Sequence, residues 1–341
     1  MKKIFLLFSA AALFVFYGCS AKVMKKDALR NVSRVGVLSV SVNKIKPDTK
    51  GNASVLKAAA DKTRMSLEKY LKSMAGYRVV SAARMARYKT YRYAGRVSKL
   101  PGAVNYAKKE AEINPQFAGQ FAVEGKASMA DVFSTILRGE LTDSQREQAV
   151  VNFMKVSQKK LNAYNKHFVT AAGMPFIPYH IFNENERGVV KVEVKAGDAK
   201  KERNYMKEMM LEGIGGLCKK FGLDAMVVAY VETEAPPLGS MRVISGKRAL
   251  GYVGLDTTLV MIDKNGKIIA DTGWKQDKPA KHSLPMYRVT KWRVSGKHRT
   301  IKEAVTDLTD AKGSIKRQLL ELAEETTRGA VKEVADAMKS E

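Results

Sequence analysis

The chain has 341 residues, of which 45% are hydrophobic and 28% charged, a balance typical of a folded protein that excludes collagen-like and wholly disordered chains. Its two cysteines are too few for a disulfide framework, a four-cysteine zinc site or a cysteine-ligated iron–sulfur cluster. Lysine and arginine number 60 against 34 acidic residues, a formal charge of +26. Such an excess points to anionic partners.

The N-terminal residues have the pattern of a targeting signal. Two lysines precede an uncharged apolar run of 14 residues, Ile4 to Tyr17, which is the length of a signal peptide's apolar region and shorter than the ~20 residues that span a bilayer. This run alone is compatible with a general secretory signal or a short anchor. The residues Phe16-Tyr17-Gly18-Cys19 resemble the lipobox of bacterial lipoproteins, in which the signal is cut before a cysteine that becomes acylated.

The lipobox resemblance implies a signal peptide over residues 1–18, lipid attachment at Cys19 and hence a membrane as partner. In lipoproteins an Asp directly after the cysteine favours the inner membrane. Ser20 at that position implies the outer membrane, with the domain on its periplasmic face. Residues 19–32 are expected to be a lipidated tether, and residues 33–341 one α/β domain.

The domain is predicted to begin with a β-α-β unit. Its elements are a β-branched strand over 34–42, a loop over 48–52, an amphipathic helix over about 54–74 and a short strand over 77–82. Residues 83–204 then interrupt this pattern. We expect a largely helical insertion there, with a helix after Thr142, where Gln145 three residues on completes a capping box. An alternating strand follows at 190–195.

The pattern of strands and helices returns after residue 200. A helix through Met206 and Leu217 precedes a buried strand over 225–231. The strands 255–262 and 267–274 are predicted to pair as a hairpin, because Asn265-Gly266 between them accepts positive φ at low cost. The last helix is expected to run from about Ile301 or Ser314 to Met338. The fold class predicted is α/β (α+β), a small mixed sheet with packed helices plus the insertion.

This layout resembles a group of envelope lipoproteins. The segments that carry the resemblance are Arg34–Val42, Gly222–Val231 and Leu255–Ala270. The group includes the penicillin-binding-protein activator lipoproteins, the curli-secretion lipoprotein and the N-terminal domain of the Tol system β-propeller protein. The resemblance covers roughly residues 33–82 and 205–275 and implies a small mixed sheet and a role in docking an envelope protein. Fold alone does not establish function.

No motif predicts catalysis, a metal site or a cofactor. The four histidines form no His-Glu-x-x-His pair, and the sequence contains neither a nucleophile elbow nor a phosphate-binding loop. The glycines Gly213, Gly215 and Gly216 lie within a predicted helix, which favours close helix packing over a dinucleotide site. Cys218 lies in an apolar stretch and is expected to be a packed core thiol. We therefore predict a protein that is not an enzyme.

Two stretches are strongly basic. Residues 78–109 hold nine basic and no acidic residues, and residues 275–302 hold nine basic residues against Asp277, with tyrosines or tryptophan interleaved in both. Such stretches can be a solvated surface, or a face that binds phosphate or carboxylate groups through guanidinium forks. The candidate binding residues are Arg84, Arg87, Arg92, Arg96, Lys291, Trp292, Arg293 and Arg299. We expect both stretches mostly on loops or surface helices.

Three functions remain open. The first is a non-catalytic lipoprotein that docks an envelope protein, and the second is a module that binds an anionic envelope polymer such as peptidoglycan or lipopolysaccharide. The third is an envelope hydrolase whose site has no recognisable motif. Nucleic acid would fit the charge, but an exported protein does not normally meet it, so no nucleic-acid partner is expected. The sequence leaves the oligomeric state open.

Overall fold

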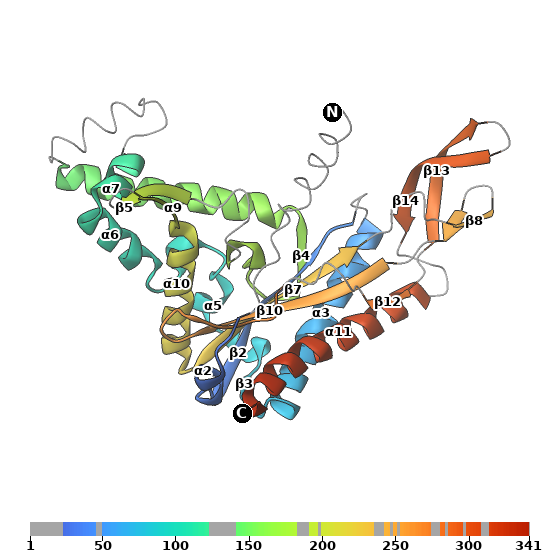
Figure 1. Ribbon diagram of the computed structural model, residues 1–341, viewed down its shortest axis with the longest axis horizontal. Coiled ribbons are helices and arrows are strands. Elements are labelled where there is room, and N and C mark those ends of the chain that lie inside the picture. The colour runs from blue at the N-terminus through green and yellow to red at the C-terminus, as the bar shows by residue number, and fades with distance from the viewer. Residues whose placement is uncertain are drawn as a thin grey trace, which may run out of the picture.

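The computed structural model describes most of the chain between Val23 and Ser340. The described ranges are 23–45, 50–122, 141–182, 191–196, 199–234, 242–245, 248–250, 253–273, 280–283, 286–295, 298–307 and 314–340. They form a mixed α/β fold in which a large sheet lies between helical layers (Figure 1). This confirms the fold class predicted from the sequence.

The large sheet has eight strands in the described part of the chain, and its main path runs β1-β11-β10-β7-β2-β3. These strands are β1 (Val23–Met24), β2 (Arg34–Asn43), β3 (Arg78–Val80), β7 (Ala225–Glu234), β10 (Val253–Asp263) and β11 (Ile268–Asp271), while β4 (Phe168–Thr170) pairs with β2 and β12 (Ala280–Ser283) with β10. Strand β2 is parallel to β3 and β7, whereas β10 is antiparallel to β7 and β11. The predicted hairpin beside β7 is therefore confirmed.

The centre of the sheet is apolar on both faces. Every residue of β7 from Ala225 to Val231 is buried, and successive side chains enter two different hydrophobic cores. Met226, Val228 and Tyr230 face one core, and the residues between them face the other. A strand of this kind is stable only when both faces of its sheet are covered.

One face is covered by α2 (Lys26–Arg30), α3 (Lys50–Ser73) and α11 (Ser314–Lys339). α3 and α11 pack against each other, and Glu324 on α11 accepts hydrogen bonds from Lys69 and from the Tyr70 hydroxyl of α3 at 3.3 and 2.8 Å. Lys62 and these two donors lower the pKa of Glu324 to about 2. Helix α3 begins at Lys50, so the expected loop over 48–52 is wrong for its last three residues.

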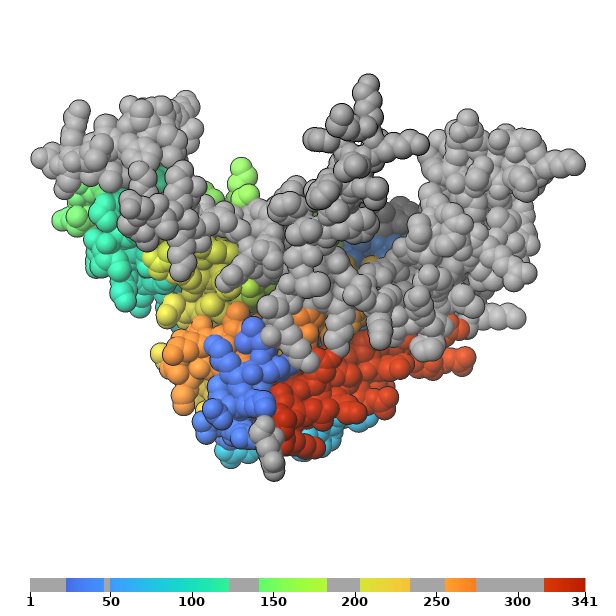
Figure 2. All heavy atoms as spheres, viewed as in Figure 1, coloured from blue at the N-terminus to red at the C-terminus, as the bar shows by residue number. Residues whose placement is uncertain are grey.

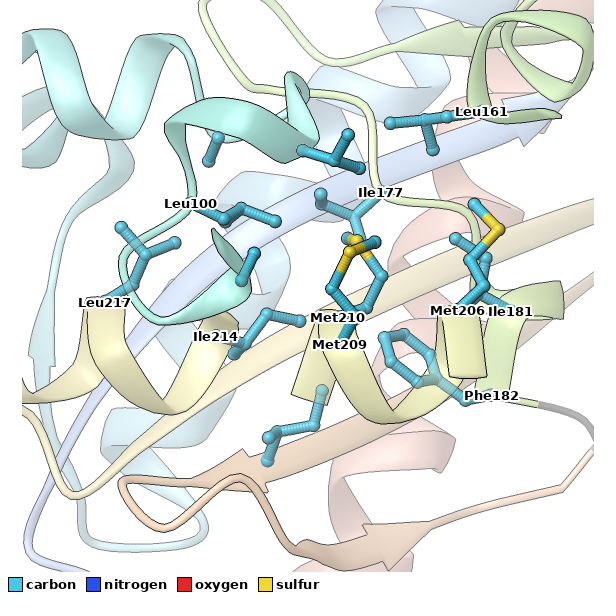
Figure 3. Packing of buried hydrophobic residues seen from close by; sticks show 14 of the residues in the cluster. Leu100, Leu161, Ile177, Ile181, Phe182, Met206, Met209, Met210, Ile214 and Leu217 are labelled. Atoms are coloured by element: carbon cyan, nitrogen blue, oxygen red, sulfur yellow. The ribbon is translucent and has the colours of Figure 1, made fainter. Parts of the chain in front are cut away.

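The other face is covered by α10 (Tyr205–Phe221) and by most of the segment between β3 and α10. The elements of that segment are α4 (Ala82–Met85), α5 (Lys89–Arg92), η1 (Val97–Lys99), α6 (Ala103–Ile113), α7 (Pro115–Ala122), α9 (Asp143–Asn165) and η2 (Tyr179–Phe182). Thr142 and Gln145 form the predicted capping box of α9. Figure 3 shows side chains of α10 and of this segment interdigitating above the sheet. The segment is largely helical as predicted, but it is a structural layer and shares its core with the sheet.

The remaining strands lie outside the large sheet. β5 (Lys191–Ala196) and β6 (Ala199–Asn204) pair with each other, so the predicted strand near 190–195 is confirmed. The strands β14 (His298–Asp307), β13 (Met286–Ser295), β9 (Arg248–Leu250) and β8 (Arg242–Ser245) form a four-stranded sheet in that order. Because residues 298–307 form β14, the last helix begins at Ser314, the second of the two starts predicted.

The expected tether is wrong for residues 23–32. β1 pairs with β11, and α2 buries Leu29 against α11 and the sheet. Residues 1–22, which include the predicted signal and Cys19, lie outside the described part of the chain. Among the helices that the structure describes, none is both long and apolar enough to cross a bilayer.

The glycines of α10 allow it to lie close to its neighbours, as the sequence predicted. A Cβ at Gly213 would lie 2.9 Å from the side chain of Leu100, and one at Gly215 would lie 2.8 Å from the backbone of Gly266 in the β10–β11 turn. A Cβ at Gly216 would collide with the backbone of Pro101. These glycines therefore fix the distance of α10 from the hairpin and from the η1–α6 connection.

Gly266→Ala should destabilise the protein more than Gly76→Ala. Both glycines have positive φ, 72° and 75°, where a side chain costs about 1–2 kcal/mol. A Cβ at Gly266 also meets the Leu211 carbonyl oxygen at 2.9 Å, while one at Gly76 meets nothing within 4 Å. Gly329→Ala, in an open position of α11, should instead stabilise by about 1 kcal/mol. Urea unfolding of the three variants tests this order, and equal losses at Gly266 and Gly76 would contradict the close contact.

Candidate functional site

The first basic stretch forms a coherent surface on α4 and α5. Its exposed members, here called the arginine–tyrosine surface, are Arg84, Arg87, Tyr88, Lys89, Arg92, Tyr93 and Arg96. Tyr88 and Tyr93 keep 54% and 42% of their surface exposed, which is unusual for large rings in a folded protein. Ser81 begins α4 by accepting a hydrogen bond from the Arg84 amide. All four arginines predicted here are therefore exposed and close together in the chain.

The inner side of the same segment holds it on the sheet. The buried residues recur mostly at every third position and are Ala82, Met85, Tyr91, Ala94, Val97 and Leu100. Short helical turns of this kind place every third side chain on one side. Met85 packs over Gly36 of β2, where an added Cβ would lie 3.0 Å from the Met85 sulfur. The exposed arginines thus belong to a segment whose other side is packed against the sheet.

Tyr91 attaches the buried side of this segment to β2, at a point where the register of the strand shifts. The register of β2 against β7 shifts between Val37 and Ser39, so that Leu38 is an extra residue in the strand. The buried Tyr91 hydroxyl donates to the carbonyl oxygens of Val37 and Leu38 at 3.0 and 3.1 Å. Burial raises the pKa of Tyr91. Tyr91, one of the tyrosines interleaved in the basic stretch, is therefore a core residue that supports the surface.

The electrostatic character of the arginine–tyrosine surface is set by the absence of acids from its own segment. No Asp or Glu occurs between Arg78 and Lys109. Glu68 of α3 is an acid that contacts this segment. Its carboxylate accepts a hydrogen bond from the Ala82 amide at 2.8 Å and lies 3.6 Å from the Arg64 guanidinium. The guanidinium of Arg96 lies over the Tyr93 ring, 5.0 Å from its centroid.

The surface continues onto the end of α10. The Tyr88 ring packs edge-on against Phe221, with centroids 5.4 Å apart. Phe221 follows two exposed lysines, Lys219 and Lys220, in the last turn of α10. The positive surface therefore spans two helical elements that are far apart in the sequence.

The second basic stretch lies elsewhere. Lys291, Trp292 and Arg293 belong to β13, and Arg299 belongs to β14, so the expectation of loops or surface helices is wrong for these residues. Trp292 pairs with Ile301, and Arg293 with Thr300, in an antiparallel register. α5 and β13 lie well apart in Figure 1. The structure does not bring the two basic stretches together, because β13 and β14 belong to a separate sheet.

A cluster that the sequence analysis missed lies between α6 and α10. Arg203 donates to both oxygens of Glu110 at 2.8 and 2.9 Å and also pairs with Glu208, which accepts a hydrogen bond from the Tyr106 hydroxyl at 2.7 Å. Both glutamates hold the guanidinium charged and raise the pKa of Arg203, Glu208 most strongly. The cluster borders a cavity of about 520 Å³. Because each charge is already paired, it cross-links the layer and offers no free cation to a ligand.

One sequence feature could have indicated this cluster. Glu110 occupies the buried side of α6 together with Ala103 and Ala107, at a spacing of seven and three residues. An acid on the apolar side of an amphipathic helix requires a partner. Its partner Arg203 is 93 residues away in the sequence, and no local pattern connects the two.

The described residues include one cysteine and His180, whose surroundings determine their chemistry. They hold no group of three His, Cys, Asp or Glu side chains that could bind a metal ion. Cys218 is buried as predicted, and desolvation raises its pKa to about 12, so it is a thiol at neutral pH. His180 lies among aromatic rings, where burial lowers its pKa to about 4.

Comparison with known proteins gives no relative. No protein-family model matches the chain, and no curated protein and no solved structure is significantly similar to it. The chemistry of the arginine–tyrosine surface is therefore defined by its own residues.

Tyr91→Phe should destabilise the protein by about 1–3 kcal/mol, because it leaves two buried carbonyl groups of β2 without their donor. Tyr93→Phe is the matched control. Its hydroxyl is on an exposed side chain, and we expect no measurable change in urea unfolding. If both variants unfold at the same urea concentration as the parent, Tyr91 does not support the surface through its hydroxyl.

Proposed function

We propose that this chain is a non-catalytic, lipid-anchored envelope protein that binds an acidic protein partner through its arginine–tyrosine surface. The observation that carries the proposal is the exposed cluster of Arg84, Arg87, Arg92 and Arg96 around two exposed tyrosines. A solvated surface needs charge, but it gains nothing from exposing aromatic rings. An interface gains from both, since arginine and tyrosine are enriched among the residues that contribute most to protein binding.

The type of partner follows from the same side chains. The guanidinium group forms paired hydrogen bonds with carboxylates, and a tyrosine ring adds apolar contact with a polar end. An acidic protein surface supplies both complements. Peptidoglycan and lipopolysaccharide are also anionic and are the alternative partners. They would bind mainly through charge, whereas a protein interface should depend on the two rings as well.

The anchor is proposed at Cys19, on the outer membrane. Support comes from the 14-residue apolar run before Gly18-Cys19 and from Ser20 after it. A protein held by several acyl chains stays bound to a membrane, since each buried methylene contributes about 0.8 kcal/mol and a single chain anchors only marginally. The domain would then act at the periplasmic surface of that membrane.

Reversing Arg84, Arg87 and Arg92 to Glu should abolish capture of the partner in a crosslinked pull-down from intact cells. The matched control reverses Lys159, Lys160 and Lys166, which are exposed at the end of α9 and give the same change of net charge. We expect the control to retain binding and both variants to fold, since exposed charges contribute little to stability. Binding should also weaken as salt rises.

A second pair of variants separates the two kinds of partner. Tyr88→Ala with Tyr93→Ala should weaken binding to a protein several-fold. It should weaken adsorption to purified peptidoglycan or lipopolysaccharide less, since there the rings add only stacking on sugars to the attraction of the charges. Salt-sensitive binding to the purified polymers that is lost in the arginine variant, with no protein captured, would favour the polymer instead. Equal capture by the arginine variant and its control would contradict any role of this surface.

Cys19→Ser should move the protein from the membrane pellet to the soluble fraction, because the lipid is the proposed attachment. The measurement is fractionation of broken cells followed by a salt wash of the membranes. A Ser20→Ala variant, which leaves the cysteine in place, should remain in the pellet. A Cys19→Ser protein that still sediments after the wash would show that the anchor lies elsewhere.

A further inference from the structure

The described chain begins in a segment that is fixed to the domain. β1 pairs with β11 at Val23–Asp271 and Met24–Ala270, and the Lys25 amide donates to the Ile269 carbonyl oxygen at 2.9 Å. The Arg30 guanidinium donates to the carbonyl oxygens of Met338 and Ser340, both at 2.8 Å, at the end of α11. From Val23 on, the described chain is therefore held in a fixed position relative to the sheet.

A positive surface surrounds this segment. Its exposed basic residues, here called the anchor-end surface, are Lys25, Lys26, Arg30, Lys264, Lys267 and Lys339. They come from the N-cap and body of α2, the β10–β11 turn and the end of α11. Figure 2 shows the N-terminal elements (blue) lying between the hairpin (orange) and α11 (red).

The acids of this surface do not cancel its charge. The acids are Asp27, Asp224, Asp263 and Asp336, four carboxylates against six basic side chains, which leaves an excess of two positive charges. Asp224 accepts hydrogen bonds from the Ser33 and Arg34 amides, both at 3.0 Å, and the Lys264 amine lies 3.7 Å from its other oxygen. Asp263 accepts from the amides of Asn265 and Lys267 at 2.9 and 2.8 Å. The anchor-end surface is therefore positive overall.

The proposed anchor determines what this surface faces. Three residues lie between Cys19 and Val23, so the chain makes four residue-to-residue steps. A fully extended chain covers at most about 3.3–3.6 Å per step, or about 14 Å in all. A charged membrane surface acts over about 8 Å at physiological salt. A group of four to eight basic residues so close to an anchor is typical of proteins that bind anionic lipids.

We propose that the anchor-end surface lies against the membrane and binds the phosphate headgroups of anionic phospholipids, which orients the domain on the bilayer. This inference rests on the proposed lipid attachment at Cys19. The residues beneath the arginine–tyrosine surface pack in the other core of the sheet, since Leu29 of α2 and Met85 of α4 lie in different cores. An oriented domain would hold both surfaces in fixed directions relative to the bilayer.

The test uses the mature lipidated protein reconstituted into vesicles. One set contains equal amounts of phosphatidylglycerol and phosphatidylcholine, and the other contains phosphatidylcholine alone. A fluorophore is attached at Asn31→Cys, beside α2, or at Ala163→Cys on α9, both exposed positions. Cys218 is buried and stays unlabelled. Quenching by a lipid with a spin-labelled headgroup reports how close each position lies to the bilayer.

We expect several-fold stronger quenching at position 31 than at position 163 in the anionic vesicles, and a weaker difference in the neutral ones. Reversing Lys25, Lys267 and Lys339 to Glu should reduce the quenching at position 31 to the neutral level, as should high salt. Reversing Lys159, Lys160 and Lys166 should change nothing. Equal quenching at the two positions, or quenching at 31 that ignores lipid charge, salt and the triple reversal, would overturn the inference.

The outcome separates this inference from the anchor itself. If the protein remains in the vesicles after a salt wash but quenching at position 31 is the same in anionic and neutral vesicles, the lipid anchor is retained and the orienting surface is refuted. Protein that washes out of both kinds of vesicle refutes the anchor and the orienting surface together. A Cys19→Ser variant that still sediments with cell membranes after the salt wash does the same.

Discussion

The fold depends on one constraint, the two-sided apolar character of β7 and β2. Ala225–Val231 is buried along its whole length, so neither face of the sheet centre can meet water. The chain satisfies this with α3 and α11 on one face, and with α10 and the segment between β3 and α10 on the other. The segment that interrupts the sequence pattern is thus what covers the second face. Tyr230 of β7, for example, packs against Phe168 and Tyr179 of this segment.

This constraint also explains which parts of the fold could be predicted from the sequence. The strands and long helices have local periodicity, and the β10–β11 turn has a local Asn-Gly signal, so each could be predicted from a few neighbouring residues. The role of residues 83–204 could not. The helices over residues 82–100 are short, and the buried residues there recur mostly at every third position, which matches neither the α-helix nor the strand period. Only contacts with β2, such as the Tyr91 hydrogen bonds, show that the segment is part of the core.

The candidate site, too, could be predicted from the sequence only in part. The four arginines could be predicted because a basic stretch without acids is visible in composition alone. Which tyrosines accompany them could not be predicted, since exposure of Tyr88 and Tyr93 and burial of Tyr91 depend on the packing of α4 and α5 over the sheet. The two basic stretches have similar compositions but lie in different parts of the fold. The helices α4 and α5 of the first stretch pack on the large sheet, whereas β13 and β14 of the second belong to the four-stranded sheet.

The position of the chain's N-terminal segment connects the fold to the proposed function. A long flexible tether would let the domain rotate freely, and any surface could then meet any partner. Because β1 and α2 are held by β11 and by the end of α11, the proposed lipid on Cys19 would restrain the domain through only a few residues. Restraint of this kind reduces the orientations that a binding surface must search, which lowers the entropy lost on association. The same paired strand that closes the sheet would therefore determine which face the protein presents to a partner in the periplasm.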